Sequence, residues 1–313
     1  MGEHNGANSF GPRTKFDLVH AHSPFSAGME AFRYAKVRNL PLISTFHSRY
    51  YDDFYSVTKS KAIAEIGVKT IIAFYNTCDE IWTVSHYAAE TLKSYGYRGN
   101  ITVIPNGTES VDDDCAVSIV DKEYSLGDEV IFLYVGQVNL KKNILTSMQA
   151  LSLLKKQGYN FKFLIVGSGP DKEKLETSAK ELGITDNIIF IHHIYDKKML
   201  NAIYKRADLF IFPSLYDTAG LVVQEAASMG TASAVVSNTG PSENVVNGFN
   251  GILSINSPQA LSESIRIYMD DRDAFGMLGE NAKNTIPQSW DSIIDRVMSE
   301  YERIIEESKH KNR

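Results

Sequence analysis

Two acidic residues stand eight positions apart in the stretch FPSLYDTAGLVVQEAASMG, residues 212–230. Its apolar start predicts a strand, which runs into a tight loop holding Asp217 and then into a helix that carries Glu225. The first backbone N–H groups of such a helix, at Gly220, Leu221 and Val222, have no partner inside the helix and attract a phosphate or diphosphate. The spacing therefore places two carboxylates beside an expected anion site.

Other candidates for ligand contact lie where further predicted strands end. Gly167 and Gly169, in VGSGP, precede a helix that begins near Asp171, so the backbone can approach a ligand closely there. A short G-x-G is also typical of an ordinary strand-to-helix turn, and both interpretations stay open. His22 ends a strand at the edge where open α/β sheets bind ligands. His20 is expected to be structural.

The elements that must position these residues follow from the hydrophobic pattern. Apolar runs alternate with helical patterns almost throughout, which predicts parallel sheets covered by helices on both faces. Candidate strands of the second half are 129–136, 161–167, 187–193, 208–214, 231–237 and 250–255. Those of the first half are 16–22, 41–47, 79–85 and 101–107. We therefore predict an α/β protein with two Rossmann-like, doubly wound domains, and 313 residues suffice for two cores.

The domain boundaries are expected where this pattern lapses. Residues 108–129 are acidic and patternless, so we predict a linker over 111–128. It separates an N-terminal domain, 1–110, from a C-terminal domain, 129–288. Residues 289–313 have the apolar spacing of a helix.

Charge and cysteine content narrow the function classes. The net charge is −6, with 11 Lys and Arg against 10 Asp and Glu through Ser110 and 21 against 28 afterwards. The acidic second part argues against nucleic acid as the ligand. Cys78 and Cys115 are the only cysteines, which fits a reducing compartment. No apolar run is long enough to span a bilayer and the start is no signal peptide, so a cytoplasmic location is expected.

Six segments in order carry a resemblance to a known family. They are VHAHSPFSAG (19–28), STFH (44–47), VIPNG (103–107), VGQVNLKKN (135–143), VGSGPDKEKL (166–175) and the two-acid loop. The chain resembles the retaining glycosyltransferases of family 4, especially bacterial lipid and polysaccharide glycosyltransferases. The resemblance implies the GT-B fold, with two domains facing a cleft and a C-terminal helix that crosses back to the N-terminal domain. Relatives begin with a strand and glycine-rich loop that we do not find here, so we expect a truncated N-terminal domain.

The resemblance also implies a role for each matching residue. Glu225 would bind the ribose hydroxyls of the donor, Lys142 its diphosphate, and Ile194 its base through the backbone. His22 would face the donor sugar and the leaving group, and His47 is either an acceptor-side or a structural residue. The donor-binding set is Gly136, Gln137, Lys142, Gly167, Gly169, Ile194, Gly220, Leu221, Val222 and Glu225, and the catalytic set is His22 and Asp217.

Two positions depart from the family pattern. Gln137 stands where arginine is usual, so part of the charge that stabilises a diphosphate is missing. Asp217 stands where glutamate is usual and reaches one methylene less far, which leaves the sugar preference open. Lys142 has an alternative interpretation as a solvated lysine at a helix start, but cations are disfavoured at that end of a helix.

The expected activity is transfer of a hexose, with glucose as the leading candidate, from a UDP-sugar to a lipid or glycan acceptor. No cofactor beyond the donor and no catalytic metal are expected, because Asp271 and Asp273 follow a helical stretch and Asp112 to Asp114 lie in the linker. The alternative is a nucleotide-sugar-binding remnant without transferase activity, suggested by the missing first strand, Gln137 and Asp217. The apolar segment 59–76, with lysines, could contact an anionic membrane or simply pack on the sheet.

Overall fold

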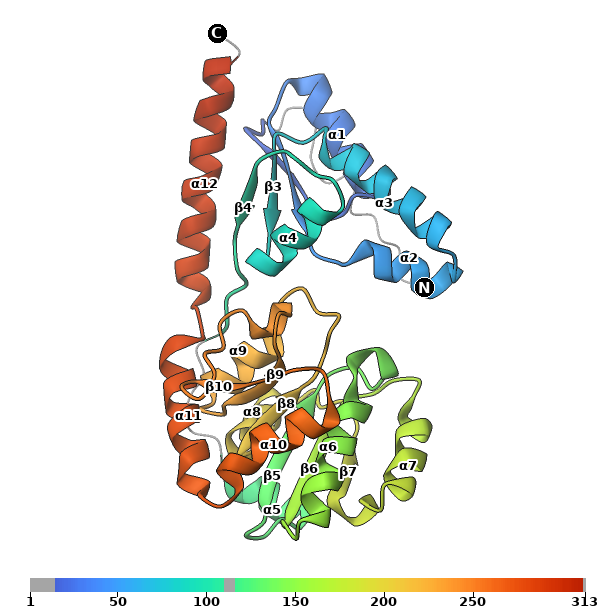
Figure 1. Cartoon of the computed structure of the whole chain (residues 1–313). Coiled ribbons are helices and arrows are strands. Elements are labelled where there is room, and N and C mark those ends of the chain that lie inside the picture. The colour runs from blue at the N-terminus through green and yellow to red at the C-terminus, as the bar shows by residue number, and fades with distance from the viewer. Residues whose placement is uncertain (1–14, 110–115, 312–313) are drawn as a thin grey trace. The chain divides into compact units, whose positions relative to one another are not determined.

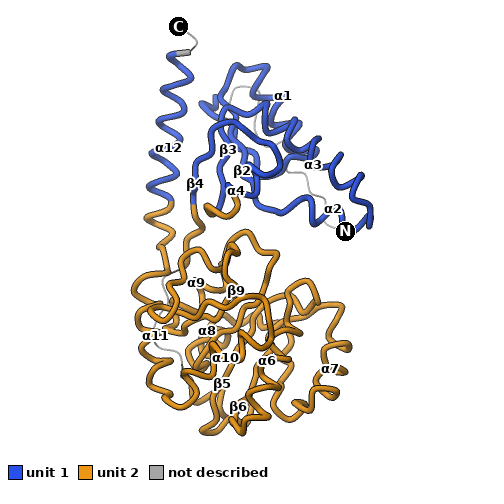
Figure 2. Tube along the Cα trace, viewed as in Figure 1, with its two compact units in different colours: residues 1–84, 89–104, 294–313 blue, residues 85–88, 105–293 orange. Residues whose placement is uncertain are grey.

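The computed structural model describes residues 15–109 and 116–311. These residues form two compact units (Figure 2). Unit 1 comprises residues up to Val84, 89–104 and 294 onward, and unit 2 comprises 85–88 and 105–293. Each unit is described by itself.

Unit 1 is built on a four-stranded parallel sheet in the order β1-β2-β3-β4. Figure 1 labels β3 and β4 of this sheet. The strands are β1 (Val19–Ala21), β2 (Leu42–Phe46), β3 (Glu80–Thr83) and β4 (Ile101–Val103). The helices between them are α1 (Ser26–Arg38), α2 (Tyr50–Thr58), α3 (Lys61–Tyr75) and α4 (His86–Ser94). Every residue of β2 and β3 is buried, as expected when a parallel sheet is covered.

Helix α12 (Trp290–Lys311) belongs to unit 1 from Ile294 on. Arg303 forms an ion pair with the buried Glu80 of β3 at 2.7 Å. Tyr301 stacks on Trp82 with 5.1 Å between ring centroids. A charge pair and an aromatic pair therefore attach this helix to the sheet of unit 1.

Unit 2 has a six-stranded parallel sheet in the order β10-β9-β8-β5-β6-β7. The strands are β5 (Val130–Val135), β6 (Phe161–Val166), β7 (Ile188–Ile191), β8 (Leu209–Phe212), β9 (Ser233–Val236) and β10 (Gly251–Ser254). The helices are α5 (Val117–Tyr124), α6 (Ile144–Lys156), α7 (Lys172–Glu181), α8 (Lys197–Arg206), α9 (Leu221–Ser228), α10 (Pro258–Met269) and α11 (Arg272–Thr285). The chain builds outward from β5 to β7 and then returns to place β8 on the other side of β5. The predicted α/β architecture is confirmed.

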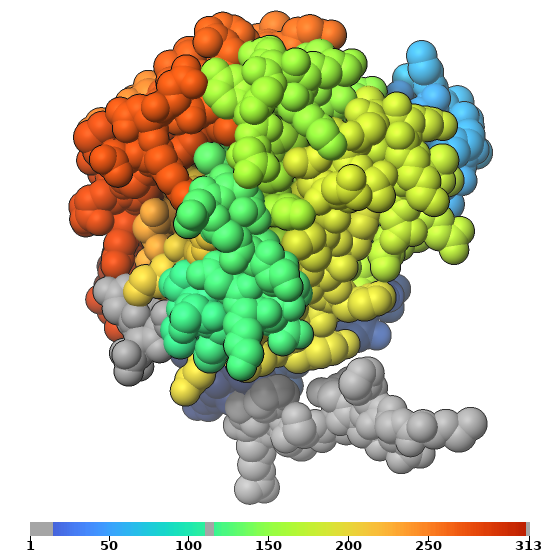
Figure 3. Space-filling view, turned by 90° about the horizontal axis from the view of Figure 1, so that it is seen from below, coloured from blue at the N-terminus to red at the C-terminus, as the bar shows by residue number. Residues whose placement is uncertain are grey.

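The predicted linker over 111–128 is wrong in its second part. Residues 117–124 form the helix α5, whose Val120 is fully buried in the core of unit 2. Arg206 of α8 donates to the Asp121 carboxylate, and Figure 3 shows α5 in green beside the yellow residues of α8. The apolar face of this helix is short and lies among acidic residues, so the sequence pattern did not indicate it. Residues 110–115 of the predicted linker lie outside the described residues.

The NG turn at Asn106 and Gly107 has a packing requirement. A β-carbon on Gly107 would lie 2.8 Å from the α-carbon of Trp290 and 2.9 Å from its backbone nitrogen. The next residue, Thr108, donates its backbone N–H to the Gln288 carbonyl at 2.7 Å. A larger residue at 107 would push apart two segments of unit 2 that a backbone bond holds together.

Helix α3 covers most of segment 59–76. Its apolar residues Val68, Ile71 and Phe74 are buried, whereas Ile63 and Ile66 are 51% and 63% exposed. Most of its apolar surface therefore packs inside unit 1, and two isoleucines remain on the outside. No helix in the described ranges is long and apolar enough to cross a membrane.

Candidate functional site

The donor residues predicted from the sequence gather at the carboxyl ends of the unit 2 strands. Gly136 and Gln137 follow β5, Gly167 follows β6, and Asp217 and Gly220 follow β8. The strand order reverses between β5 and β8, and open α/β sheets bind ligands at the crevice created by such a reversal. The topology thus brings together segments that are far apart in the sequence.

Lys142 and Asp217 form an ion pair at this reversal point. The Nζ atom of Lys142 lies 2.7 Å from Oδ1 of Asp217, and the two side chains are only 18% and 23% exposed. The second carboxylate oxygen of Asp217, Oδ2, is buried and has no hydrogen-bond partner in the described structure. Since a buried acceptor without a partner is costly, this oxygen is suited to accept a hydroxyl donor from a ligand.

The loop that carries Lys142 differs from the predicted helix start. Residues 140–142 form a short 3-10 turn, Asn143 follows with φ of 62°, and α6 begins only at Ile144. The Asn139 side chain accepts from the backbone N–H of Lys142 at 3.0 Å. The Asn143 amide donates to the Pro213 carbonyl at 3.0 Å, which ties this loop to the end of β8. Lys142 is therefore held in a loop rather than on a helix.

Two glycines keep neighbouring loops in close contact. A β-carbon on Gly167 would lie 1.9 Å from the Gly136 carbonyl oxygen, and one on Gly169 would lie 2.1 Å from the Val138 carbonyl oxygen. Gly167 also has φ of 143°, a conformation that favours glycine. The close approach of backbones explains the G-x-G, and of the two only Gly167 lines the adjoining pocket.

That pocket lies at the ends of β5, β6 and β7. Its lining comprises Val135, Gly136, Gln137, Val166, Gly167, Ser168, His193, Ile194, Tyr195 and Leu200. Ile194 belongs to the loop before α8, since β7 ends at Ile191, two residues before the predicted strand end. The apolar residues in this lining, among them Val135, Val166, Ile194 and Leu200, suit the faces of a ring system such as a nucleobase.

Gln137 stands exposed on the rim of this pocket. Its side-chain oxygen accepts from the Asn139 amide at 2.7 Å, and its backbone carbonyl accepts from the Tyr134 hydroxyl at 3.0 Å. Tyr134 is fully buried beneath the loop. The backbone at 137 is thus fixed from below while the side chain stays accessible.

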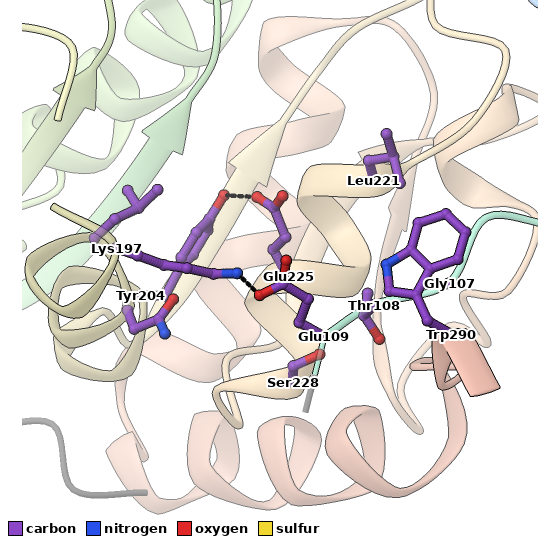
Figure 4. A pocket seen from close by; sticks show the side chains of 11 residues that line it. Gly107, Thr108, Glu109, Lys197, Tyr204, Leu221, Glu225, Ser228 and Trp290 are labelled. Atoms are coloured by element: carbon purple, nitrogen blue, oxygen red, sulfur yellow. Dashed lines mark hydrogen bonds and ion pairs between the residues drawn. The ribbon is translucent and has the colours of Figure 1, made fainter. Parts of the chain in front are cut away.

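Glu225 lies on α9, five residues into the helix that begins at Leu221, with Gly220 as its N-cap and Val222 half-buried in its first turn. Its carboxylate accepts from the hydroxyl of Tyr204 at 3.0 Å. Figure 4 shows this bond in a second pocket, which Lys197 and Glu109 also line as an ion pair. Burial raises the pKa of the Glu225 carboxyl, and the Tyr204 bond and the Lys197 charge oppose that rise. Leu200 lines both pockets, so the two adjoin.

Three histidines form a row in unit 1. The Nδ1 atom of His22 lies 3.1 Å from Nε2 of His47, and the rings of His20 and His22 stack at 4.3 Å. His20 also binds the hydroxyls of Thr45 and Tyr301, each at 2.7 Å. Burial lowers the pKa of all three, and the neighbouring histidines lower that of His20 further, to about 3.

The D-x-D pattern near the C-terminus has a structural explanation. Asp271 caps α11 and accepts from the backbone N–H of Asp273, and Arg272 pairs with Asp208 at 2.8 Å. Across 15–109 and 116–311, no group of three metal-ligating side chains is placed to hold an ion. Asp112 to Asp114 lie outside those ranges, and metal independence remains a prediction.

Several residues that shape the site were not singled out by the sequence. Tyr134 looks like a core residue in an apolar run and Tyr204 like one on an amphipathic helix, and only the structure shows that their hydroxyls bond Gln137 and Glu225. Gly240 is another, because a β-carbon there would lie 2.6 Å from the Asp217 carbonyl oxygen. The paired asparagines of NLKKN were a usable signal, since asparagine favours helix caps and left-handed positions.

Comparison with known proteins gives the same class as this geometry. Residues 119–285 match the family model described as glycosyl transferases group 1, and residues 8–110 match one described as glycosyltransferase family 4. An uncharacterised glycosyltransferase of Methanocaldococcus jannaschii is 26% identical over 310 residues, which cover 93% of this chain and 76% of that protein.

Two further matches differ in what they cover. The alpha-monoglucosyldiacylglycerol synthase of Streptococcus pneumoniae is 26% identical over 225 residues, which cover 69% of this chain and 51% of the synthase. The solved structure of the Anabaena protein HepE in complex with UDP-glucose matches with a TM-score of 0.77 at 17% identity, covering 92% of this chain and 79% of HepE.

Two parallel-sheet α/β domains with this structural match define a glycosyltransferase of the GT-B fold, as predicted. The first family model covers more than half of the chain, and the chain therefore belongs to the glycosyl transferases group 1 family. It is an enzyme that acts on nucleotide sugars.

Proposed function

We propose that the chain transfers glucose from UDP-glucose to a lipid or glycan acceptor, with retention of the anomeric configuration and without a metal ion. The observation that carries the proposal is the pairing of Lys142 with Asp217 at the strand-order reversal, with one Asp217 oxygen left without a partner. A cation and an unsatisfied acceptor side by side match a diphosphate joined to a sugar.

The proposed chemistry assigns a separate task to each group. As the bond between the sugar and the diphosphate breaks, the acceptor oxygen bonds to the anomeric carbon and the acceptor proton passes to the leaving phosphate. The Lys142 ammonium and the first N–H groups of α9 stabilise the negative charge that grows on that phosphate. The Oδ2 atom of Asp217 accepts a hydroxyl of the sugar, and Glu225 accepts the ribose hydroxyls. His22 keeps the catalytic role that the family resemblance implies.

The choice of donor and acceptor rests on the relatives. HepE was solved with UDP-glucose, and the Streptococcus pneumoniae relative is a monoglucosyldiacylglycerol synthase. If the acceptor is a lipid, the exposed Ile63 and Ile66 of α3, together with Lys61, would contact the anionic membrane surface that contains it. The cytoplasm, where nucleotide sugars are made, is the proposed location.

The test is turnover of radiolabelled UDP-glucose with diacylglycerol vesicles and with oligosaccharides, in the presence of EDTA. We expect a glucosylated product with the α configuration, read from the anomeric proton coupling in NMR. UDP binding without transfer to any acceptor would favour the alternative, a nucleotide-sugar-binding protein without transferase activity. Inactivation by EDTA, reversed by Mg²⁺, would contradict the metal-independent mechanism.

A further inference from the structure

Tyr204 is a buried residue whose hydroxyl bonds Glu225, a candidate donor-binding residue. Its side chain is 1% exposed, and its ring packs edge-on against Phe210 of β8 at 5.6 Å. Its backbone carbonyl accepts from the Thr231 hydroxyl at 2.5 Å. The ring therefore cannot move without disturbing the core, and its hydroxyl is a fixed point beneath Glu225.

The hydroxyl of Tyr204 has a defined role toward Glu225. A phenol has one proton to donate, and a carboxylate only accepts, so the proton of the 3.0 Å bond comes from Tyr204. Glutamate has three side-chain torsions, and ordering them has an entropic cost. Anchoring Oε2 leaves Oε1 and the remaining lone pairs of Oε2 in a fixed direction for other donors (Figure 4).

We propose that Tyr204 is a positioning residue that makes the site selective for ribonucleotides over deoxyribonucleotides, by holding the Glu225 carboxylate where two ribose hydroxyls can donate to it. This inference rests on the proposed function, since it requires Glu225 to bind the ribose. The Tyr204 bond should therefore affect recognition of the ribose hydroxyls, and not recognition of the base or the phosphates.

The pKa of Glu225 provides a second, independent measurement of the Tyr204 bond, and the charged groups around Glu225 must be known to interpret it. Glu109 comes from the segment after β4, and Lys197 comes from α8, as does Tyr204. Helix α11 also packs against α9, but none of its side chains lines this pocket, and every residue of α11 is described. Removing the Tyr204 hydroxyl takes away a bond that lowers the pKa of Glu225, so that pKa should rise.

The test compares the binding of UDP and 2′,3′-dideoxy-UDP by calorimetry in the wild type and in Tyr204→Phe. The wild type should prefer UDP by about tenfold to a hundredfold, the worth of hydrogen bonds to a charged group. Tyr204→Phe keeps the packing and should lower this preference by about threefold to tenfold, with the dideoxy affinity unchanged. On acidification, the preference should begin to fall at a higher pH in Tyr204→Phe than in the wild type.

Two further variants separate the possible outcomes. Tyr159→Phe removes another tyrosine hydroxyl of unit 2, one that bonds Asp270 and lines neither pocket, and should leave the preference as it is. Glu225→Ala should abolish the preference. If Glu225→Ala abolishes it and Tyr204→Phe retains it with the same pH profile, the positioning role is overturned and the proposed function stands. If Glu225→Ala also retains it, Glu225 does not bind the ribose, and both ideas are wrong.

Discussion

The candidate residues of unit 1 and unit 2 are held together by different means. In unit 1, His20, His22 and His47 stand together. Burial lowers the pKa of all three, and repulsion from a neighbouring histidine lowers the pKa of His20 and His47 further. In unit 2, Lys142 and Asp217 keep opposite charges within 2.7 Å of each other. The first arrangement favours the neutral form of its members, and the second joins two side chains of opposite sign in an ion pair. Unit 1 should therefore respond to pH, and unit 2 to the loss of a partner and to salt.

The largest effect should follow the loss of the cation in unit 2. Lys142→Met leaves Asp217 in place with both carboxylate oxygens unpaired, which should lower the free energy of unfolding by about 1–3 kcal/mol. The same change removes the proposed contact with the diphosphate, worth a further 1.5–3 kcal/mol or so of UDP binding. Urea unfolding and calorimetry measure the two losses separately.

A double variant distinguishes the two roles of Lys142. In Lys142→Met with Asp217→Asn the buried charge is gone, so most of the stability should return, because a buried pair replaced as a whole costs little. UDP affinity should stay low. Recovery of UDP affinity in the double variant would show that the Lys142 cation does not bind the phosphates. Full stability of the single variant would show that Asp217 does not depend on Lys142.

An intermediate effect is expected from the histidines of unit 1. The unfolded chain takes up a proton at His20 near pH 6.5, whereas the folded chain resists it until about pH 3. The stability is thus fully present above about pH 6.5 and should fall, as the pH decreases, by about 1.4 kcal/mol per pH unit for this one group. His20→Gln should flatten this dependence between pH 6.5 and 5.

The two tryptophans make that measurement specific to unit 1. Trp82 is buried, and 4.9 Å separates the centroid of its ring from that of His20, whereas Trp290 belongs to unit 2. In a Trp290→Phe background, fluorescence during urea unfolding follows Trp82 alone. An equal pH slope with and without His20 would mean that another group causes the dependence.

Some parts of the fold could be predicted from the sequence, and others could not. The α/β class and the strand runs followed from apolar periodicity, since fully covered parallel strands are continuous apolar segments. Helix α5 was missed because only a short apolar face, with Val120 at its centre, interrupts an acidic stretch. The end of β7 was placed two residues too late, at His193 instead of Ile191, because no glycine, proline or other turn residue follows Ile191 directly.

The sequence predicted candidate site residues, but it did not predict which side chains pair. The spacing from Asp217 to Glu225, and the family resemblance, pointed to residues that the structure places at the ends of β5 and β8. The ion pair of Lys142 with Asp217 joins the segments that follow β5 and β8, two strands that become neighbours only through the sheet order. The role of Tyr204 was not predictable for the same reason, since nothing in the sequence around it shows that its hydroxyl reaches another helix.

The smallest effect should come from adding a charge to unit 2. Gln137 is exposed on the pocket rim, and its backbone is fixed by Tyr134, so its side chain can be exchanged with little strain. Gln137→Arg places a cation beside the proposed diphosphate and should raise UDP affinity by about threefold to tenfold at low salt, the worth of a partly exposed charged hydrogen bond. The gain should shrink as salt screens it.

Two controls decide whether that gain comes from charge. Gln137→Met loses the bond from Asn139 without adding a charge, so it reports the cost of that bond alone. Gln137→Glu should weaken UDP binding, most strongly at low salt, because a second anion then faces the phosphates. If arginine and glutamate shift the affinity in the same direction, residue 137 does not face the diphosphate. Opposite shifts that converge at high salt would show that charge in unit 2 acts directly on the donor, unlike the pH-dependent stability expected of unit 1.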